Sequence, residues 1–224
     1  MERTASGKQQ SHLMPIVNCN NIMPRGEMIK TDTKKKIIRL CAPLLHEKGY
    51  LSVPISELEK ASQQSKTIIY QHFDNKTSLA VAALDYNLEL KRIKINQNIK
   101  PYYSCKKKLL KHIETYYPTI ESPFIGDGCP IFKAAGTIGN SNEEMRLRVA
   151  KALLLWKQDL SDTIKKGKLK SEFKHNVQEE DVAWEIISLI ESAVVISRTT
   201  QNLKLGLKML DQAKIKIMNL ASIK

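Results

Sequence analysis

Apolar side chains recur every three to four positions along most of the chain after Thr31, which is the pattern of amphipathic α-helices and not of β-strands. The first such segment covers about residues 33–48, and Gly49 provides its C-terminal stop. Pro43 should bend this helix, because proline removes one backbone hydrogen bond and crowds the preceding turn. Its apolar face is expected to consist of Ile37, Ile38, Cys41, Leu44 and Leu45.

Two short helices and one long helix are predicted next. Pro54 lies in the first turn of the second helix, and Ser65 is expected to cap the third. Asn75 opens the long fourth helix, which Pro101 ends. The residues expected to face inward are Ile55, Leu58 and Ala61, then Ile69 and Phe73, then Leu79, Ala82, Ala83, Tyr86, Leu90 and Ile93.

Helical patterns continue through the second half of the chain. Ser141 and Glu144 have the spacing of a capping box, in which each side chain accepts a backbone hydrogen bond at the start of a helix. The final two segments are unusually apolar. The expected bounds are Ser104 to Pro118, Pro130 to Gly139, Ser141 to Gly167, and about 180–199 and 203–220.

These elements predict an all-α fold with two domains. Residues 1–30 are rich in Ser, Asn, Gln, Gly and Pro without periodicity, and we expect a flexible N-terminal extension. Residues 31–79 should form a three-helix bundle that contains a helix-turn-helix. Residues 80–224 should form a larger helical domain, whose apolar segments can build a ligand cavity and a dimer contact.

Composition restricts the class of protein. Lys and Arg outnumber Asp and Glu by 36 to 23, and the net charge of +13 favours an anionic partner such as nucleic acid. No apolar run approaches the roughly 20 residues that span a bilayer, and no secretory signal is evident. The four cysteines form no C-x-x-C pair, so we expect no metal site, no cofactor and a cytoplasmic location.

Residues 54–73 have the spacing of a helix-turn-helix, whose second helix enters the major groove of DNA. Lys66 can contact guanine or phosphate, Gln71 can bind adenine, and Ile68 can contact a thymine methyl group. The remaining polar side chains can donate to phosphate oxygens. The predicted DNA-binding residues are Lys36, Ser65, Lys66, Thr67, Ile68, Tyr70, Gln71, His72 and Lys76.

Two basic clusters outside the recognition helix have alternative interpretations. Lys34, Lys35 and Lys36 either contact phosphate or form a solvated surface. The lysine-rich run at about 91–111 resembles a second nucleic-acid patch, but the fourth helix should lead away from DNA, which favours a solvated face.

The string Ile69-Tyr70-Gln71-His72-Phe73, followed by Lys76 and Leu79, resembles the Tyr-x-His-Phe-x-x-Lys signature of TetR/AcrR-type regulators. The resemblance implies an all-helical homodimer with a ligand-binding C-terminal domain. The family usually has glycine in the turn where Gln63 stands. Gln63 must therefore accept a conformation that glycine enters more readily, or the turn differs locally.

Aromatic side chains in the second domain are candidates for lining a ligand cavity, although plain packing explains any one of them. His112 is expected at the surface or as a satisfied core group. Cys129 precedes a helix start that would favour a thiolate, so redox sensing is an alternative to burial as a small apolar side chain. The candidate ligand-binding residues are Tyr86, Tyr116, Phe132 and Trp156.

The last two helices are apolar over more than one face, which predicts that they bury a second side against another copy of the chain. The expected dimer interface consists of Ile186, Ile190, Val194, Leu203, Leu207 and Leu210. The alternative is that both helices fill the core of a monomer.

The function predicted from these features is a repressor that a small molecule releases from a near-palindromic operator in double-stranded DNA. The sequence does not distinguish a repressor of transcription from an activator. One alternative is a basic helical interaction protein that has lost specific DNA binding. An enzyme is disfavoured because the sequence contains no G-x-S-x-G, H-E-x-x-H or G-x-x-x-x-G-K motif, and no catalytic residue is predicted.

Overall fold

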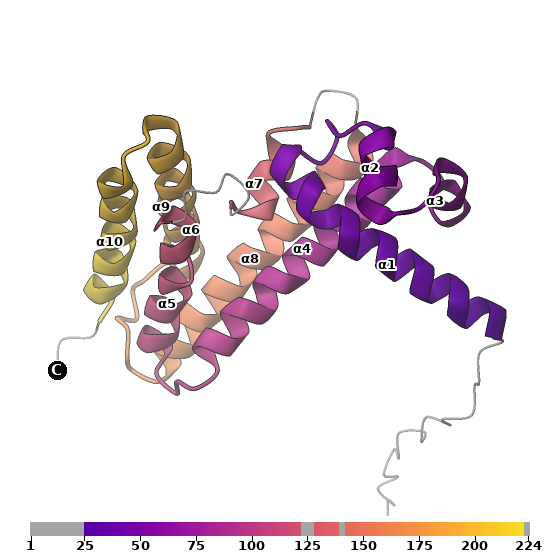
Figure 1. Cartoon of the computed structure of the whole chain (residues 1–224). Coiled ribbons are helices and arrows are strands. Elements are labelled where there is room, and N and C mark those ends of the chain that lie inside the picture. Colours follow the sequence, from indigo (N-terminus) through magenta and orange to yellow (C-terminus); the bar gives the residue numbers. More distant parts are fainter. Residues whose placement is uncertain (1–24, 122–127, 139–141, 222–224) are drawn as a thin grey trace, which may run out of the picture.

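The computed structural model describes residues 25–121, 128–138 and 142–221, and within these residues the chain forms ten helices (Figure 1). Among these residues, β-structure is limited to an isolated antiparallel β-bridge between Phe173 and Ala221. The all-α prediction is confirmed. The helices are α1 Arg25–Lys48, α2 Ile55–Ser62, α3 Lys66–His72, α4 Lys76–Ile99, α5 Cys105–Glu114, α6 Tyr117–Glu121, α7 Pro130–Ala135, α8 Glu143–Leu169, α9 Glu179–Thr200 and α10 Leu203–Asn219.

Helices α1, α2 and α3 form the small N-terminal bundle. Ile37, Leu58 and Ile69, one from each helix, are completely buried in its core, as their spacing predicts. Burial of each such side chain contributes about 1.5–3 kcal/mol to stability. The core therefore fixes how α3 is presented to solvent.

Helix α1 is longer than predicted. It begins at Arg25 instead of near Thr33, so residues 25–30, expected to be flexible, belong to this helix. It continues through Pro43 to its end at Lys48. Residues 1–24 lie outside the described part of the chain.

Helix α4 crosses the predicted boundary between the two domains. Asn75 caps it in a capping box, because its side chain accepts from the N–H of Ser78 at 2.9 Å and its own N–H donates to the Ser78 hydroxyl at 3.2 Å. The boundary expected after Leu79 falls inside the helix. One end of α4 packs against α1 and the other against α5 and α8 (Figure 1).

The buried stripe of α4 is shorter than predicted. Leu79 and Ala83 are buried, but Leu90 and Ile93, expected to face inward, are 49% and 40% exposed. Helix α4 still contacts α1 at Asn87, whose side chain donates to the Ala42 carbonyl at 3.1 Å. Beyond Asn87 its side toward α5 and α8 borders a pocket, and Leu90 and Ile93 are not among the residues that line it. Apolar spacing alone assumes one continuous core and so extends the stripe too far.

The connection from α5 to α6 contains a proline inside a helix. Pro118 lies in the first turn of α6, where its missing N–H removes no intrahelical bond, and it does not simply end α5. Helix α7 ends at Ala135 with Gly136 as its C-cap, and is therefore shorter than predicted. Gly139, the expected end, lies outside the described residues.

Helix α8 also differs from prediction at both ends. Asn142 is its N-cap, and the predicted cap Ser141 lies outside the described residues. The helix continues past Gly167 to Leu169. Gly167 is a packing position, because a Cβ atom there would lie 2.2 Å from the ring of Phe173.

Helices α9 and α10 form a hairpin at the end of the molecule away from α3 (Figure 1). Ile186, Ile190 and Leu210 are completely buried within this one chain, and Val194 is nearly so. Side chains with so little exposed surface cannot form a substantial contact with a partner. The prediction that these four belong to a dimer interface is therefore corrected: they hold the hairpin on its own domain.

Candidate functional site

The turn between α2 and α3 is built without glycine. Gln63 ends α2 in the left-handed conformation, with φ 56° and ψ 34°, so the first of the two alternatives for this turn holds. Such a conformation is less favourable for a residue with a Cβ atom than for glycine. The N–H of Lys66 donates to a Glu59 carboxylate oxygen at 2.6 Å, which ties the start of α3 to α2.

The solvent face of α3 is the one expected to meet DNA. Ser65 caps the helix, and its hydroxyl accepts from the N–H of Ile68 at 3.4 Å. Ile69 and Phe73 point into the bundle. The solvent face carries the exposed residues Lys66, Thr67, Tyr70 and Gln71 and the half-buried residues Ile68 and His72.

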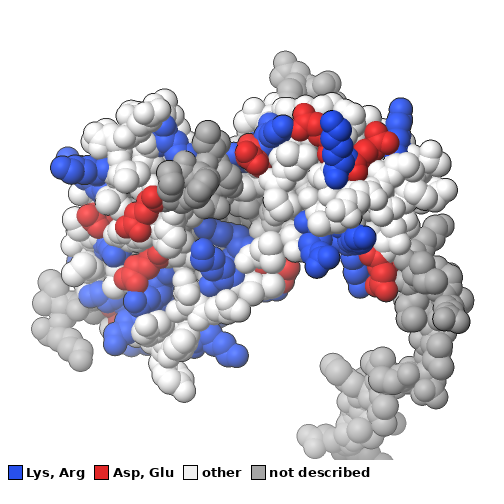
Figure 2. Space-filling view, viewed as in Figure 1, with Lys and Arg blue, Asp and Glu red and all other residues white. Residues whose placement is uncertain are grey.

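Cations from α1 and α3 lie beside this face. The Lys66 ammonium lies 5.9 Å from the centroid of the Tyr70 ring, and the Lys34 ammonium 5.2 Å from that of Phe73. Lys36 is exposed on the same helix as Lys34. Figure 2 shows a separate group of Lys and Arg side chains over α4, α5 and α8, away from the helix-turn-helix.

Lys76 makes hydrogen bonds within the chain that were not predicted from the sequence. Its ammonium donates to the backbone carbonyls of Leu51 at 3.0 Å and Val53 at 3.2 Å. These bonds tie the first turn of α4 to the loop between α1 and α2. Two of the three ammonium protons are used, and one remains for an acceptor outside the chain.

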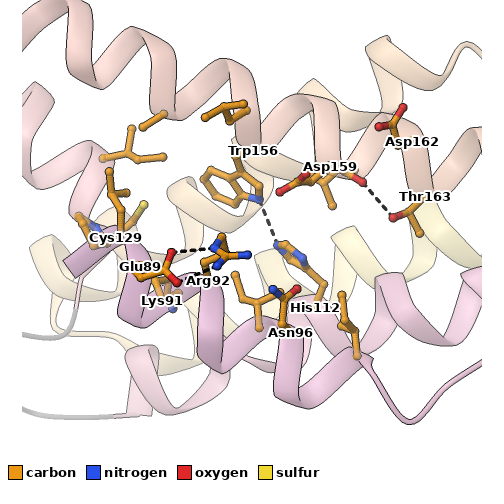
Figure 3. A pocket seen from close by; sticks show the side chains of 18 of the residues that line it. Glu89, Lys91, Arg92, Asn96, His112, Cys129, Trp156, Asp159, Asp162 and Thr163 are labelled. Atoms are coloured by element: carbon orange, nitrogen blue, oxygen red, sulfur yellow. Dashed lines mark hydrogen bonds and ion pairs between the residues drawn. The ribbon is translucent and has the colours of Figure 1, made fainter. Parts of the chain in front are cut away.

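A pocket of about 640 Å³ lies between α4, α5, α7 and α8 (Figure 3), a size typical of sites for small molecules. Of the four candidate ligand-binding aromatics, Tyr116 and Trp156 line this pocket. Tyr86 borders a separate hollow of about 540 Å³ on α1 and α4. Phe132 lines neither and is 39% exposed.

Three nearly parallel rings form one wall of the pocket. His112, Tyr116 and Trp156 have interplanar angles of 15° to 28°. The indole N–H of Trp156 donates to Nε2 of His112 at 3.1 Å (Figure 3). Burial, with a contribution from Lys91, lowers the pKa of His112 to about 3, so the ring is neutral at physiological pH. Since Nε2 accepts, the proton of the neutral ring is on Nδ1.

Charged and sulfur-containing groups lie around this wall. The Lys91 ammonium lies 3.8 Å from the centroid of the Tyr116 ring. Glu191 on α9 is 3% exposed, and neither carboxyl oxygen has a hydrogen-bond partner among the described residues. Burial raises the pKa of Cys129 well above its usual value. Cys129 is 4% exposed, so of its two alternatives the structure supports burial as a small apolar side chain and not a thiolate.

Two parts of the chain match known family descriptions. Residues 37–83 match the bacterial regulatory proteins of the tetR family, and residues 105–206 match the tetracyclin repressor-like C-terminal domain. The two matches follow each other in the order of the two domains described above. The chain belongs to the TetR family.

Solved structures of TetR regulators have the same fold. One from Cytophaga hutchinsonii is 26% identical, with a TM-score of 0.79 over 88% of this chain and 98% of that one. One from Chloroflexus aurantiacus is 22% identical, with a TM-score of 0.78 over 88% of this chain and 100% of that one. A regulator from Saccharomonospora viridis, solved in complex with choline, is 19% identical, with a TM-score of 0.72 over 86% and 100% of the chains. A search of curated proteins found no match.

TetR-family proteins are transcriptional regulators and not enzymes, which confirms the expectation that the chain is no enzyme. In the described part of the chain, no three His, Cys, Asp or Glu side chains come together to hold a metal ion. No helix among the same residues is long and apolar enough to cross a membrane.

Two charged residues near the ring wall were not singled out from the sequence. Lys91, which lines the pocket, was assigned to a solvated basic run. Glu191, which is buried but does not line the pocket, lies in the apolar helix α9. The one available signal for Glu191 was its place between buried Ile190 and Ala193, because a carboxylate on an apolar face is rarely tolerated without a reason.

Proposed function

We propose that this TetR-family chain is a repressor that binds a near-palindromic operator as a homodimer and leaves it when a small molecule occupies the pocket. The observation that carries the proposal is that one helix, α4, connects the two sites: it packs in the DNA-binding bundle at one end and lines the pocket at the other. A ligand that prefers one of two positions of α4 shifts the equilibrium between them. The choline complex of the similar Saccharomonospora viridis regulator supports ligand binding by this fold. A cytoplasmic location follows from access to DNA.

In the proposed complex α3 enters the major groove. Lys66 and Gln71 contact base edges, and the Ile68 methyl groups and Thr67 approach thymine methyl groups. Phosphate contacts fix the position of α3 without reading sequence. We assign them to Lys36, Ser65, Tyr70, His72 and Lys76.

The proposed dimer uses the solvent-facing side of the α9–α10 hairpin. Val195 on α9 and Leu205 and Ile215 on α10 are exposed apolar side chains there. Exposed Ser188, about two helical turns before Val195, is small enough to allow close approach of a second copy. Of the residues first expected at the interface, Leu203 is exposed and Leu207 half-buried, so both can still contribute.

Selection of bound sequences from random duplex DNA tests this function. The expected product is a pair of inverted half-sites, with an affinity that falls steeply as salt concentration rises. Enrichment of no sequence, together with salt-insensitive or absent DNA binding, would contradict the proposal. It would favour a basic helical interaction protein instead.

A further inference from the structure

The wall of the pocket favours a flat, apolar ligand body. His112, Tyr116 and Trp156 present nearly parallel rings, and Leu109 and Ile131 lie beside them. Aromatic rings stack in offset arrangements that contribute about 0.5–1.5 kcal/mol beyond area burial. A planar aromatic ring therefore fits this wall better than a branched aliphatic group.

The charges around the pocket favour an anion. Its lining contains six Lys and Arg side chains against four Asp and Glu. Two of these acids are already neutralised, because Arg92 binds Glu89 at 2.7 Å and Arg148 binds Asp85. No described residue forms an ion pair with the three remaining rim lysines, Lys108, Lys151 and Lys166.

The position of Lys91 decides against a cationic ligand. A ligand cation would seek the face of an aromatic ring, but the Lys91 ammonium already lies 3.8 Å from the centroid of the Tyr116 ring. The same ammonium can pair with a ligand anion. His112 offers a second donor, because no described residue accepts a hydrogen bond from its Nδ1–H.

We propose that the pocket binds a planar aromatic carboxylate, whose ring lies against His112 and Trp156 and whose carboxylate pairs with Lys91. This inference rests on the proposed function in one respect, that a small molecule occupies this pocket. It adds the chemical class of the ligand and the residue that selects it. Lys91 lies on α4, so the ion pair acts on the helix that reaches the DNA-binding bundle.

Calorimetric titration of the full chain with three matched probes tests the proposal. The probes are 2-naphthoate, its neutral analogue 2-naphthamide, and a naphthyl trimethylammonium salt. We expect the carboxylate to bind about tenfold or more tighter than the amide, the gain of a charge-assisted contact, and the ammonium salt to bind weakest. Lys91→Met should abolish the preference for the carboxylate over the amide, and Lys91→Arg should keep it.

Lys94→Met is the matched control, because Lys94 is exposed on the same helix and does not line the pocket. It should leave the preference unchanged. Equal or tighter binding of the ammonium salt overturns the proposal, as does a carboxylate preference that survives in Lys91→Met. Absence of binding by all three probes at millimolar concentration overturns it as well.

The binding experiment is independent of the proposed repressor mechanism. A carboxylate that binds through Lys91 but does not release operator DNA would contradict release by ligand, and the ligand class would still hold. Conversely, the protein could bind DNA sequence-specifically while no aromatic carboxylate binds the protein or affects its DNA binding. That result would contradict the ligand class and leave the DNA-binding function standing.

Discussion

At the scale of single residues, the Lys76 ammonium does two things at once. It donates to the carbonyls of Leu51 and Val53, and in the proposed complex its third proton is donated to a phosphate oxygen. Lys76→Met should therefore lower the free energy of unfolding by about 2 kcal/mol, the loss of hydrogen bonds to a charged group. It should also weaken binding to all DNA sequences similarly and flatten the salt dependence by about one phosphate contact.

Urea unfolding and binding titrations at several salt concentrations measure these two effects. Lys100→Met is the control, because Lys100 is exposed at the other end of α4. It should change neither quantity. A Lys76→Met protein with normal stability and an unchanged salt slope would contradict both assignments.

Two exposed side chains of α3 should determine sequence preference. Lys66→Ala or Gln71→Ala should weaken binding to the selected operator by about 1–3 kcal/mol while leaving random DNA nearly unaffected. Tyr70→Phe, which removes a phosphate donor, should weaken both kinds of DNA alike. Competition binding with operator and random duplexes distinguishes the two groups, and equal losses for Lys66→Ala would move that residue to the phosphate contacts.

The buried Glu191 should make stability depend on pH. Burial raises its pKa from 4.5 to about 7, although the neighbouring Cys129, Lys91 and Arg198 act in the opposite direction. Between these values the folded chain keeps a proton that the unfolded chain has lost, so protonation favours folding. Stability from this group falls as pH rises through this window, by about 3 kcal/mol in total.

Glu191→Gln removes the ionisation and keeps the shape of the side chain. We expect it to raise the melting temperature relative to the unmodified protein at pH 8 and to have less effect at pH 5. Thermal unfolding at both pH values measures the difference. An identical effect of the substitution at both would show that Glu191 does not titrate in this window.

At the scale of the elements, Gly167 determines how α8 meets the segment that follows it. A Cβ atom would lie 2.2 Å from the Phe173 ring and 3.1 Å from Cβ of Cys105. Gly167→Ala should lower stability by about 1–3 kcal/mol, as overpacking of a core does. Gly136→Ala is the control, because its Cβ atom would meet nothing closer than 3.5 Å; urea unfolding of both variants should show a loss for Gly167→Ala alone.

The helices with local start signals were predictable from the sequence. Ser65, Asn75 and Ser104 each cap the helix they were expected to open, because a cap bonds to a backbone N–H three residues away. The solvent-exposed face of α3 was predictable for the same local reason. Burial depends on distant partners, so Leu90 and Ile190 were assigned to the wrong surfaces.

The pocket was the least predictable feature. Its rings and charges come from α4, α5, α8 and the segment that enters α7, and no spacing in the sequence brings these together. Tyr116 and Trp156 were identified only as aromatics in the right domain. To identify Lys91 as a pocket residue from the sequence, one would have to know that its side chain turns toward the Tyr116 ring.

At the scale of the whole molecule, the proposed dimer and the core of one chain can be distinguished by substitution. Val195 is 52% exposed and Ile190 is completely buried. Val195→Glu should give a folded monomer with weak operator binding, because one half-site is then bound alone. Ile190→Asp should unfold the domain, since it buries an unpaired charge.

Sedimentation and circular dichroism of both variants measure assembly and folding separately. Leu169→Glu, at an exposed apolar position on α8, is the control and should remain dimeric. A Val195→Glu protein that stays dimeric would place the interface on another surface. A monomeric unmodified protein would contradict the dimer itself.

Because α4 has no break at the boundary between the two domains, it can act as a rigid lever. Its 24 residues correspond to about 36 Å at 1.5 Å per residue. A tilt of about 5° around its C-terminal end moves the other end by about 3 Å over that length. In a two-fold dimer the two displacements add, which changes the distance between the recognition helices by up to about 6 Å against the roughly 34 Å between successive major grooves. We therefore expect a tilt too small to disturb the core of either domain to be enough to lose one of the two half-sites.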